Sequence, residues 1–144
     1  MTFILRVIHD LVTQDPHTVF VHFPIALTSA ALFFILLALW KKNDILELIA
    51  FADISLAAVS TVVTGIIGIR DNIVFYHGGA ANHVIKIILA SILFLVTSAM
   101  AILRWRNPKL FHSRFKAVYI MGYFVSFALV SVLGFLGGVI IYGF

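Results

Sequence analysis

Four long apolar stretches, separated by short polar or basic connections, make up most of the chain. They cover about residues 16–40, 45–70, 83–104 and 116–142. Each stretch is long enough to cross a bilayer as an α-helix, which needs roughly 20 apolar residues. The pattern therefore predicts an all-α fold, a bundle of four transmembrane helices that forms a single integral membrane domain over residues 1–144.

Apolar residues also recur at helical spacing before the first stretch, between residues 3 and 12, with polar residues on the opposite face. This spacing predicts a short helix that lies in the membrane interface. Asp15 and Pro16 then favour a helix start, because aspartate caps a helix and proline suits its first position. Asn82 is predicted to cap the third helix in the same way.

Basic residues gather in two of the three connections, which hold seven of the ten lysines and arginines. Cytoplasmic loops are enriched in these residue types. The chain is therefore predicted to be a multi-pass membrane protein, with both termini and the 71–82 loop outside the cytoplasm, which is the periplasmic side in a bacterial inner membrane. The seven basic residues are Lys41, Lys42, Arg104, Arg106, Lys109, Arg114 and Lys116.

The composition agrees with a membrane location, since 62% of the residues are hydrophobic, 11% are charged and the mean hydropathy is +1.13. Without cysteine the chain forms no disulfide, thiolate-bound zinc site, iron-sulfur cluster or c-type haem attachment. The net charge of +4 is explained by the basic connections, so nucleic acid is not an expected partner. The sequence also shows no phosphate loop, calcium loop or hydrolase constellation, which argues against hydrolysis and nucleotide chemistry.

Five of the six histidines fall at the predicted periplasmic edge, in two distant parts of the sequence. Many histidines lie at such an edge only because amphipathic side chains favour it. His22, however, lies within a helical segment, where ionisable side chains are functional candidates, and His83 begins the third helix at a similar depth. Two imidazoles from different helices are the axial ligands that a b-type haem requires. His22 and His83 are therefore the predicted ligands of the haem iron, with His17 and His77 as substitutes or a second pair.

Glycines lie at the same predicted level as these histidines. They are Gly65 and Gly68 in the second stretch and Gly134, Gly137 and Gly138 in the fourth. Such residues make room for a flat cofactor or, alternatively, let membrane helices pack closely. Combined with the histidines, they favour a cofactor pocket.

Pro24 is expected to kink the first helix, because it lacks the backbone donor that would bond to the carbonyl of Phe20. The freed carbonyl is available to a ligand, or the proline serves packing alone. Asp53, inside the second stretch, is interpreted either as a residue hydrogen-bonded to serine or threonine hydroxyls or as part of a proton route.

Two other classes of function remain open. The same imidazoles of His17, His22, His77 and His83 suit copper, zinc or iron in a protein that binds or transports transition metals. The third class is a non-catalytic membrane subunit whose histidines bridge loops.

The string from Pro16 to Leu27, with its His17-x4-His22-Phe23-Pro24-Ile25-Ala26 pattern, resembles the opening of a bacterial membrane-protein family known as domain of unknown function 2231. The similarity covers almost the entire chain, although family members often carry asparagine where this chain has Ile87. It continues through Thr64-Gly65-x-x-Gly68-x-x-Asp71, Ala80-x-x-His83 and Leu136-Gly137-Gly138-x-x-x-Tyr142. The resemblance implies a four-span domain, located in the bacterial inner membrane, which in this family is sometimes attached to Rieske or cytochrome-type domains.

The predicted function is thus that of a membrane protein that binds haem b and transfers single electrons at the periplasmic side, as an oxidoreductase component. Its expected partners are the lipid bilayer and a redox protein or quinone. The sequence also allows a homo-oligomer.

Overall fold

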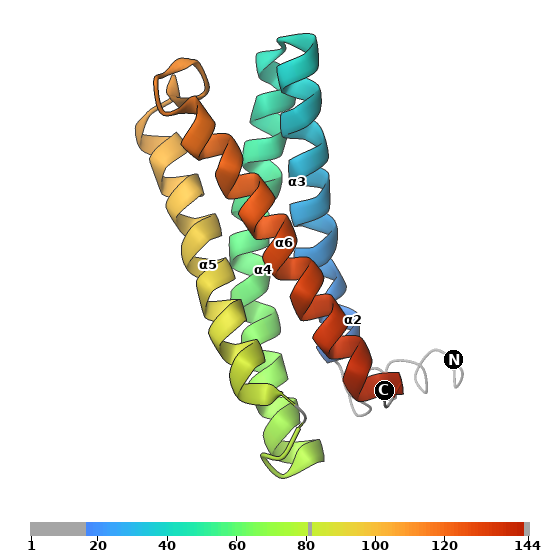
Figure 1. Cartoon of the computed structure of the whole chain (residues 1–144). Coiled ribbons are helices and arrows are strands. Elements are labelled where there is room, and N and C mark those ends of the chain that lie inside the picture. The colour runs from blue at the N-terminus through green and yellow to red at the C-terminus, as the bar shows by residue number, and fades with distance from the viewer. Residues whose placement is uncertain (1–16, 81, 143–144) are drawn as a thin grey trace, which may run out of the picture.

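The computed structural model describes residues 17–80 and 82–142. In chain order these residues form α2 His17–Phe20, α3 His22–Lys41, α4 Asp44–Tyr76, α5 His83–Arg106, the 3-10 turn η1 Leu110–His112 and α6 Lys116–Tyr142 (Figure 1). The four helices α3 to α6 are long and apolar enough to cross a membrane. The predicted all-α fold with four candidate spans is therefore confirmed.

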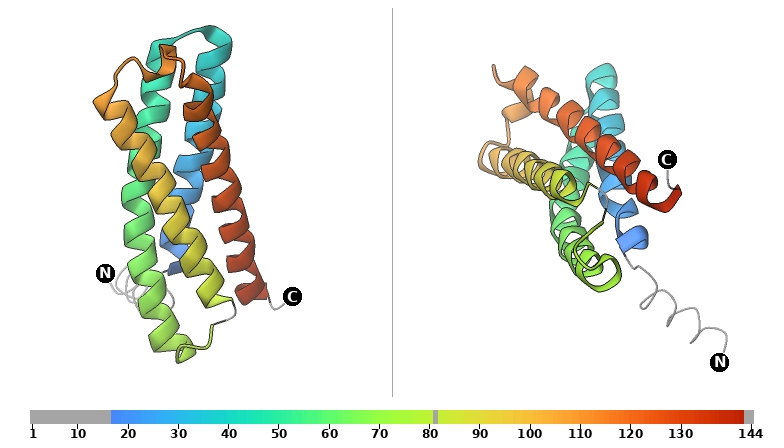
Figure 2. Two further views of the ribbon diagram at one scale, coloured as in Figure 1. Left: turned by 60° about the vertical axis from the view of Figure 1, so that its left-hand side comes forward. Right: turned by 60° about the horizontal axis from the view of Figure 1, so that its bottom comes forward.

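The four long helices run up and down and form a bundle. α3 and α5 each pack against α4 and α6, so that α3 and α5 lie diagonally opposite each other (Figure 2). The connections 42–43 and 107–115 lie together at one end, here called the basic end (Figure 1). The starts of α3 and α5 and the ends of α4 and α6 lie at the opposite end, here called the histidine end.

The seven basic residues that were predicted to share one side of the membrane do lie at one end of the bundle, because both basic connections are at the basic end (Figure 1). Which side of the membrane this end faces remains a prediction. The predicted interfacial helix and the helix start at Asp15 and Pro16 lie outside the described residues.

The interior of the bundle contains many small side chains. α3 and α4 both contribute alanines that are fully buried, and small residues let membrane helices approach closely. Large apolar side chains such as Phe33 and Leu95 point outward and remain exposed. Since the interior and the outside are both apolar, the bundle is suited to lipid on its sides. The buried alanines of α3 and α4 are Ala31, Ala38, Ala50, Ala57 and Ala58.

The second long helix, α4, continues to Tyr76, beyond the predicted end of the apolar stretch at residue 70. Polar residues at this point do not end the helix, because the side chain of Asp71 is buried. The helix ends where His77 and Gly78 adopt the left-handed conformation, and the amide of Gly78 donates to the carbonyl of Asn72 at 2.8 Å.

Asn82 does not cap α5 with its side chain as predicted. It has a left-handed backbone conformation (φ 56°) and its side chain makes no capping hydrogen bond. Only its carbonyl takes part in the helix start, by accepting from the amide of Lys86 at 3.0 Å.

Pro24 interrupts the pattern of helical hydrogen bonds, so that α2 ends at Phe20 and α3 begins at His22. Val21 between them keeps a helical backbone conformation (φ −63°, ψ −24°), and the kink at Pro24 stays a prediction. Because Pro24 has no amide hydrogen, the carbonyl of Phe20 lacks its usual helical donor. The hydroxyl of Thr64, on α4, donates to this carbonyl at 3.2 Å. The freed carbonyl therefore serves packing between the first part of the chain and α4.

Candidate functional site

The structure brings the predicted ligand histidines to the same end of the bundle. His17 begins α2, His22 begins α3, His77 follows the end of α4 and His83 begins α5. All four positions belong to the histidine end (Figure 1). His9 lies outside the described residues.

The ring of His83 is oriented by a hydrogen bond to the backbone. It is half-buried, and its Nδ1 lies 2.9 Å from the carbonyl oxygen of Ala80. A carbonyl only accepts, so Nδ1 carries the proton and donates it. In the neutral ring Nε2 is then unprotonated, and this is the tautomer that binds a metal through Nε2.

His22 differs from His83 because its side chain is exposed. The buried face of α3 begins with Pro24 and continues through Thr28 and Ala31. At 100° per residue, His22 lies about 160° around the helix from Pro24. Its ring therefore does not point into the bundle interior. His77 is also exposed, next to the left-handed turn that ends α4.

Close packing does not explain three of the glycines at the histidine end, Gly65, Gly134 and Gly137. A Cβ atom added to Gly65 or Gly137 would meet no other atom within 4 Å, and one added to Gly134 would make only an ordinary contact with Ile25 at 3.4 Å. Gly68 and Gly138 are half-buried in the same helices. Within the described chain, Gly65 and Gly137 therefore leave space beside their helices and do not serve close contact between helices.

A cavity of about 180 Å³ lies between the first part of the chain and α4. Sites for small molecules usually have volumes of about 300–1,000 Å³. The cavity is lined by Phe20, Phe23, Ser60, Val63 and Thr64, and none of these residues is a histidine. It is therefore too small for a porphyrin and is separate from the candidate ligands.

No group of three or more histidine, aspartate or glutamate side chains that could hold a metal ion occurs within residues 17–80 and 82–142. This observation bears on the copper and zinc hypothesis, since protein sites for these ions normally use three or four side-chain ligands.

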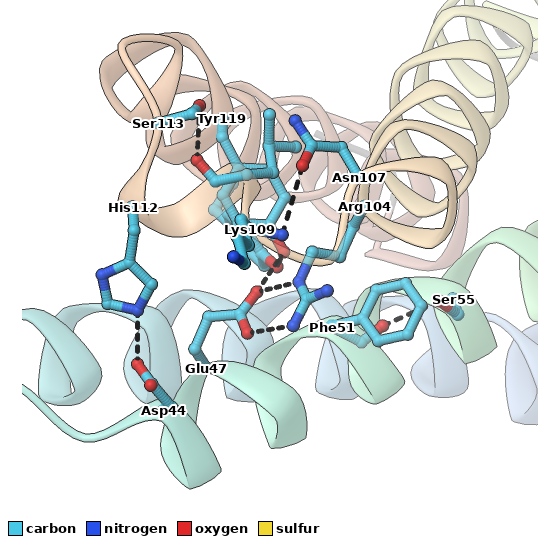
Figure 3. Close-up of polar contacts among 12 residues, drawn as sticks. Asp44, Glu47, Phe51, Ser55, Arg104, Asn107, Lys109, His112, Ser113 and Tyr119 are labelled. Carbon is cyan, nitrogen blue, oxygen red and sulfur yellow. Dashed lines mark hydrogen bonds and ion pairs between the residues drawn. The ribbon is translucent and has the colours of Figure 1, made fainter.

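A buried polar network at the basic end was not predicted from the sequence. The guanidinium of Arg104 on α5 donates from Nε and Nη2 to the two carboxylate oxygens of Glu47 on α4, at 2.7 and 2.8 Å (Figure 3). The hydroxyl of Tyr119 on α6 donates to Glu47 Oε1 at 2.9 Å and lies 2.7 Å from the hydroxyl of Tyr123. The network thus joins α4, α5 and α6.

Glu47, Tyr119 and Tyr123 are buried, and the side chain of Arg104 is partly buried, at 14% exposed. Glu47 is 1% exposed and Tyr123 is 0% exposed. The carboxylate accepts three hydrogen bonds, and such a paired and bonded ion is the form in which a charge is tolerated in an apolar interior. Two features of the sequence could have indicated this network. Glu47 in the first turn of α4 lies at the same depth as Arg104 near the end of α5, and a Tyr-x-x-x-Tyr pair lies near the start of α6.

His112, the histidine at the basic end, forms an exposed pair with Asp44. Its Nε2 lies 2.8 Å from Asp44 Oδ1, and the two side chains are 61% and 70% exposed (Figure 3). Such an exposed contact joins η1 to the start of α4 but contributes little to stability.

These features define a four-helix membrane protein with a structural polar network at one end and helix-borne histidines at the other. The chain matches the family described as predicted membrane protein (DUF2231) over residues 15–144, and it belongs to that family. The resemblance seen in the sequence is thereby confirmed. No curated protein and no solved structure matches the chain.

Proposed function

We propose that this membrane protein binds haem b at the histidine end and transfers single electrons there. His22 and His83 are the proposed axial ligands of the iron, and His17 and His77 are the substitutes. The observation that carries the proposal is that two diagonally opposite helices, α3 and α5, both begin with a histidine at the same end of the bundle.

The ligand count favours haem over a bare metal ion. A porphyrin supplies the equatorial ligands of its iron, so the protein needs to provide only two axial side chains. A copper or zinc ion needs a larger set of protein ligands, and the described residues contain no such set. For this reason haem is preferred to the transition-metal alternative.

The donor chemistry of the site fits haem iron. The hydrogen bond from His83 Nδ1 to the carbonyl of Ala80 holds the ring in the tautomer that leaves Nε2 for a metal. Because the cavity beside Phe20 and Thr64 is too small for a porphyrin and His22 faces outward, a macrocycle would have to lie outside the packed interior at the histidine end. The space beside Gly137 is at this end.

Bound haem would supply a one-electron iron couple, and the chain would hold and orient it near the membrane edge. The basic residues at the other end support a periplasmic location for this edge, in a bacterial inner membrane. A membrane quinone or a redox protein is the proposed electron partner.

The test is the absorption spectrum of the whole chain, purified in mild detergent from cells supplied with excess haem. We expect a Soret band and, after reduction, separate α and β bands. His22→Ala and His83→Ala should each lose these bands. His112→Ala is the matched control, because it removes an imidazole at the basic end, and it should keep the spectrum of the unchanged protein.

Circular dichroism of each variant must show unchanged helix content, so that loss of haem is not loss of fold. Colourless protein that is folded and was produced with ample haem would refute the proposal. Stoichiometric copper or zinc by elemental analysis, without porphyrin, would instead establish the transition-metal alternative. If neither ligand is found, and His22→Ala with His83→Ala weakens only stability or partner binding, the chain is a non-catalytic subunit.

A further inference from the structure

Asp53 is an acidic residue well inside the membrane-spanning part of α4. The helix starts at Asp44, so a rise of 1.5 Å per residue places Asp53 about 13 Å along its axis. The hydrocarbon core of a bilayer is about 30 Å thick, and Asp53 is therefore at a depth where water is scarce.

One oxygen of this carboxyl group, Oδ2, is buried and has no hydrogen-bond partner within the described part of the chain. The hydroxyl groups nearest in sequence do not serve it. Ser55 donates to the carbonyl of Phe51 at 2.7 Å, and Ser60 donates to the carbonyl of Ala57 at 3.0 Å. The interpretation that Asp53 is held by serine or threonine hydroxyls therefore finds no support in these contacts.

No cation faces Asp53 from the helices around it. Residues 23–40 of α3 and 87–103 of α5 contain no ionisable side chain, and residues 117–141 of α6 contain only Tyr119 and Tyr123. Within α4 the next ionisable side chain toward the basic end is Glu47, whose charge is already paired with Arg104. A negative charge at Asp53 would thus be unpaired in an apolar region, and an isolated buried ion of this kind neutralises instead.

We propose that Asp53 is a proton-binding site in the membrane interior, where the side chain is a carboxylic acid, in contrast to Glu47, which is paired with Arg104. The ligand is a proton, and the acid form is open to modification by an apolar carbodiimide dissolved in the lipid. The side chain of Asp53 is half-buried, so the reagent reaches it from outside the bundle.

The modification consumes the proton that the proposal assigns to Asp53. The carboxyl oxygen bonds to the central carbon of the carbodiimide, and the acid proton moves to a nitrogen of the reagent as one C=N double bond becomes single. The resulting O-acylisourea rearranges to a stable N-acylurea by transfer of the acyl group to nitrogen. No group leaves and nothing is oxidised or reduced.

The experiment treats the whole chain, reconstituted in phosphatidylcholine vesicles, with dicyclohexylcarbodiimide over a range of pH, and then locates the label by mass spectrometry of peptides. We expect one added reagent on Asp53, with less labelling as the pH rises. Glu47 is an internal control, because its ion pair with Arg104 should leave it unlabelled. Asp53→Asn, which resembles the neutral acid, should lose the label and keep the thermal midpoint of the unchanged protein.

Three results would overturn the proposal. The first is that Asp53 carries no label at any pH, and the second is that Asp53 and Glu47 are labelled equally. The third is that a water-soluble carbodiimide labels Asp53 as much as dicyclohexylcarbodiimide does. The last result would mean that water, rather than lipid, reaches the carboxyl group. None of these measurements detects porphyrin, so the outcome is independent of the haem proposal.

Discussion

Replacement of Arg104 by methionine is expected to destabilise the bundle strongly. Methionine keeps a long apolar stem but removes the guanidinium that binds both carboxylate oxygens of Glu47. The side chain of Glu47 is only 2% exposed, so water does not replace the lost donors. Loss of one partner from a buried ion pair costs about 3–5 kcal/mol, and we expect a loss of this size in the free energy of unfolding.

The expected loss for Arg104→Met can be compared with the losses expected for variants of the other network residues. Tyr123→Phe removes only the last hydroxyl, whose described partner is the hydroxyl of Tyr119, and should cost about 1 kcal/mol. Tyr119→Phe removes a donor to Glu47 and the partner of Tyr123, and should cost about 1–3 kcal/mol. Glu47→Leu combined with Arg104→Met removes both charges and should be more stable than Arg104→Met alone, because apolar replacement of a buried ion pair is often neutral.

The measurement is equilibrium unfolding in bicelles by sodium dodecyl sulfate, with helix content followed by circular dichroism. His112→Ala is the control for an ion pair at the same end, and its exposed contact with Asp44 predicts a loss of about 0–1 kcal/mol. The reasoning is refuted if Arg104→Met costs no more than Tyr123→Phe, or if the losses for Glu47→Leu and Arg104→Met simply add in the double variant.

Three smaller predictions concern packing and helix ends, and each is measured by the same unfolding titration. Gly122→Ala should cost about 1–3 kcal/mol, because the new Cβ would overlap the side chain of Met100, and Met100→Ala should relieve part of that cost; an additive pair would contradict this. Thr64→Val keeps the shape but leaves the carbonyl of Phe20 without its donor, so a loss of about 1–3 kcal/mol is expected, and no loss would mean that this bond is unimportant. Asn43→Ala removes the side-chain cap on the amide of Ile45 and should cost about 1 kcal/mol, whereas Asn43→Asp should cost less.

The number and type of the long helices could be predicted from the sequence because each span is longer than a bilayer requires and is bounded by polar residues. The end of α4 could not be predicted from the sequence, because Asp71 and Asn72 look like loop residues in a hydropathy pattern. In the structure Asp71 is buried, and the side chain of Asn72 accepts from the amide of Ala80 at 3.0 Å. Contacts made after folding thus extend the helix beyond its apolar stretch.

The candidate site was predictable in part for a similar reason. Alternation of the spans places the starts of α3 and α5 at one end, so the shared location of His22 and His83 follows from topology alone. The outward direction of His22 does not follow from topology, because it depends on which face of α3 is buried. The Glu47 network was missed because its bonds join residues 57 and 72 positions apart, and Arg104 was interpreted only as a topological signal.

The two ends of the bundle use their polar groups differently, and this contrast decides where function should be sought. At the basic end the carboxylate of Glu47 accepts hydrogen bonds from Arg104 and Tyr119, so its buried charge is already paired within the chain. At the histidine end Nδ1 of His83 donates to the carbonyl of Ala80. This bond orients the ring and leaves Nε2 without a partner among the described residues. Changes at the basic end should therefore alter stability, while changes of the helix-starting histidines should alter a bound ligand.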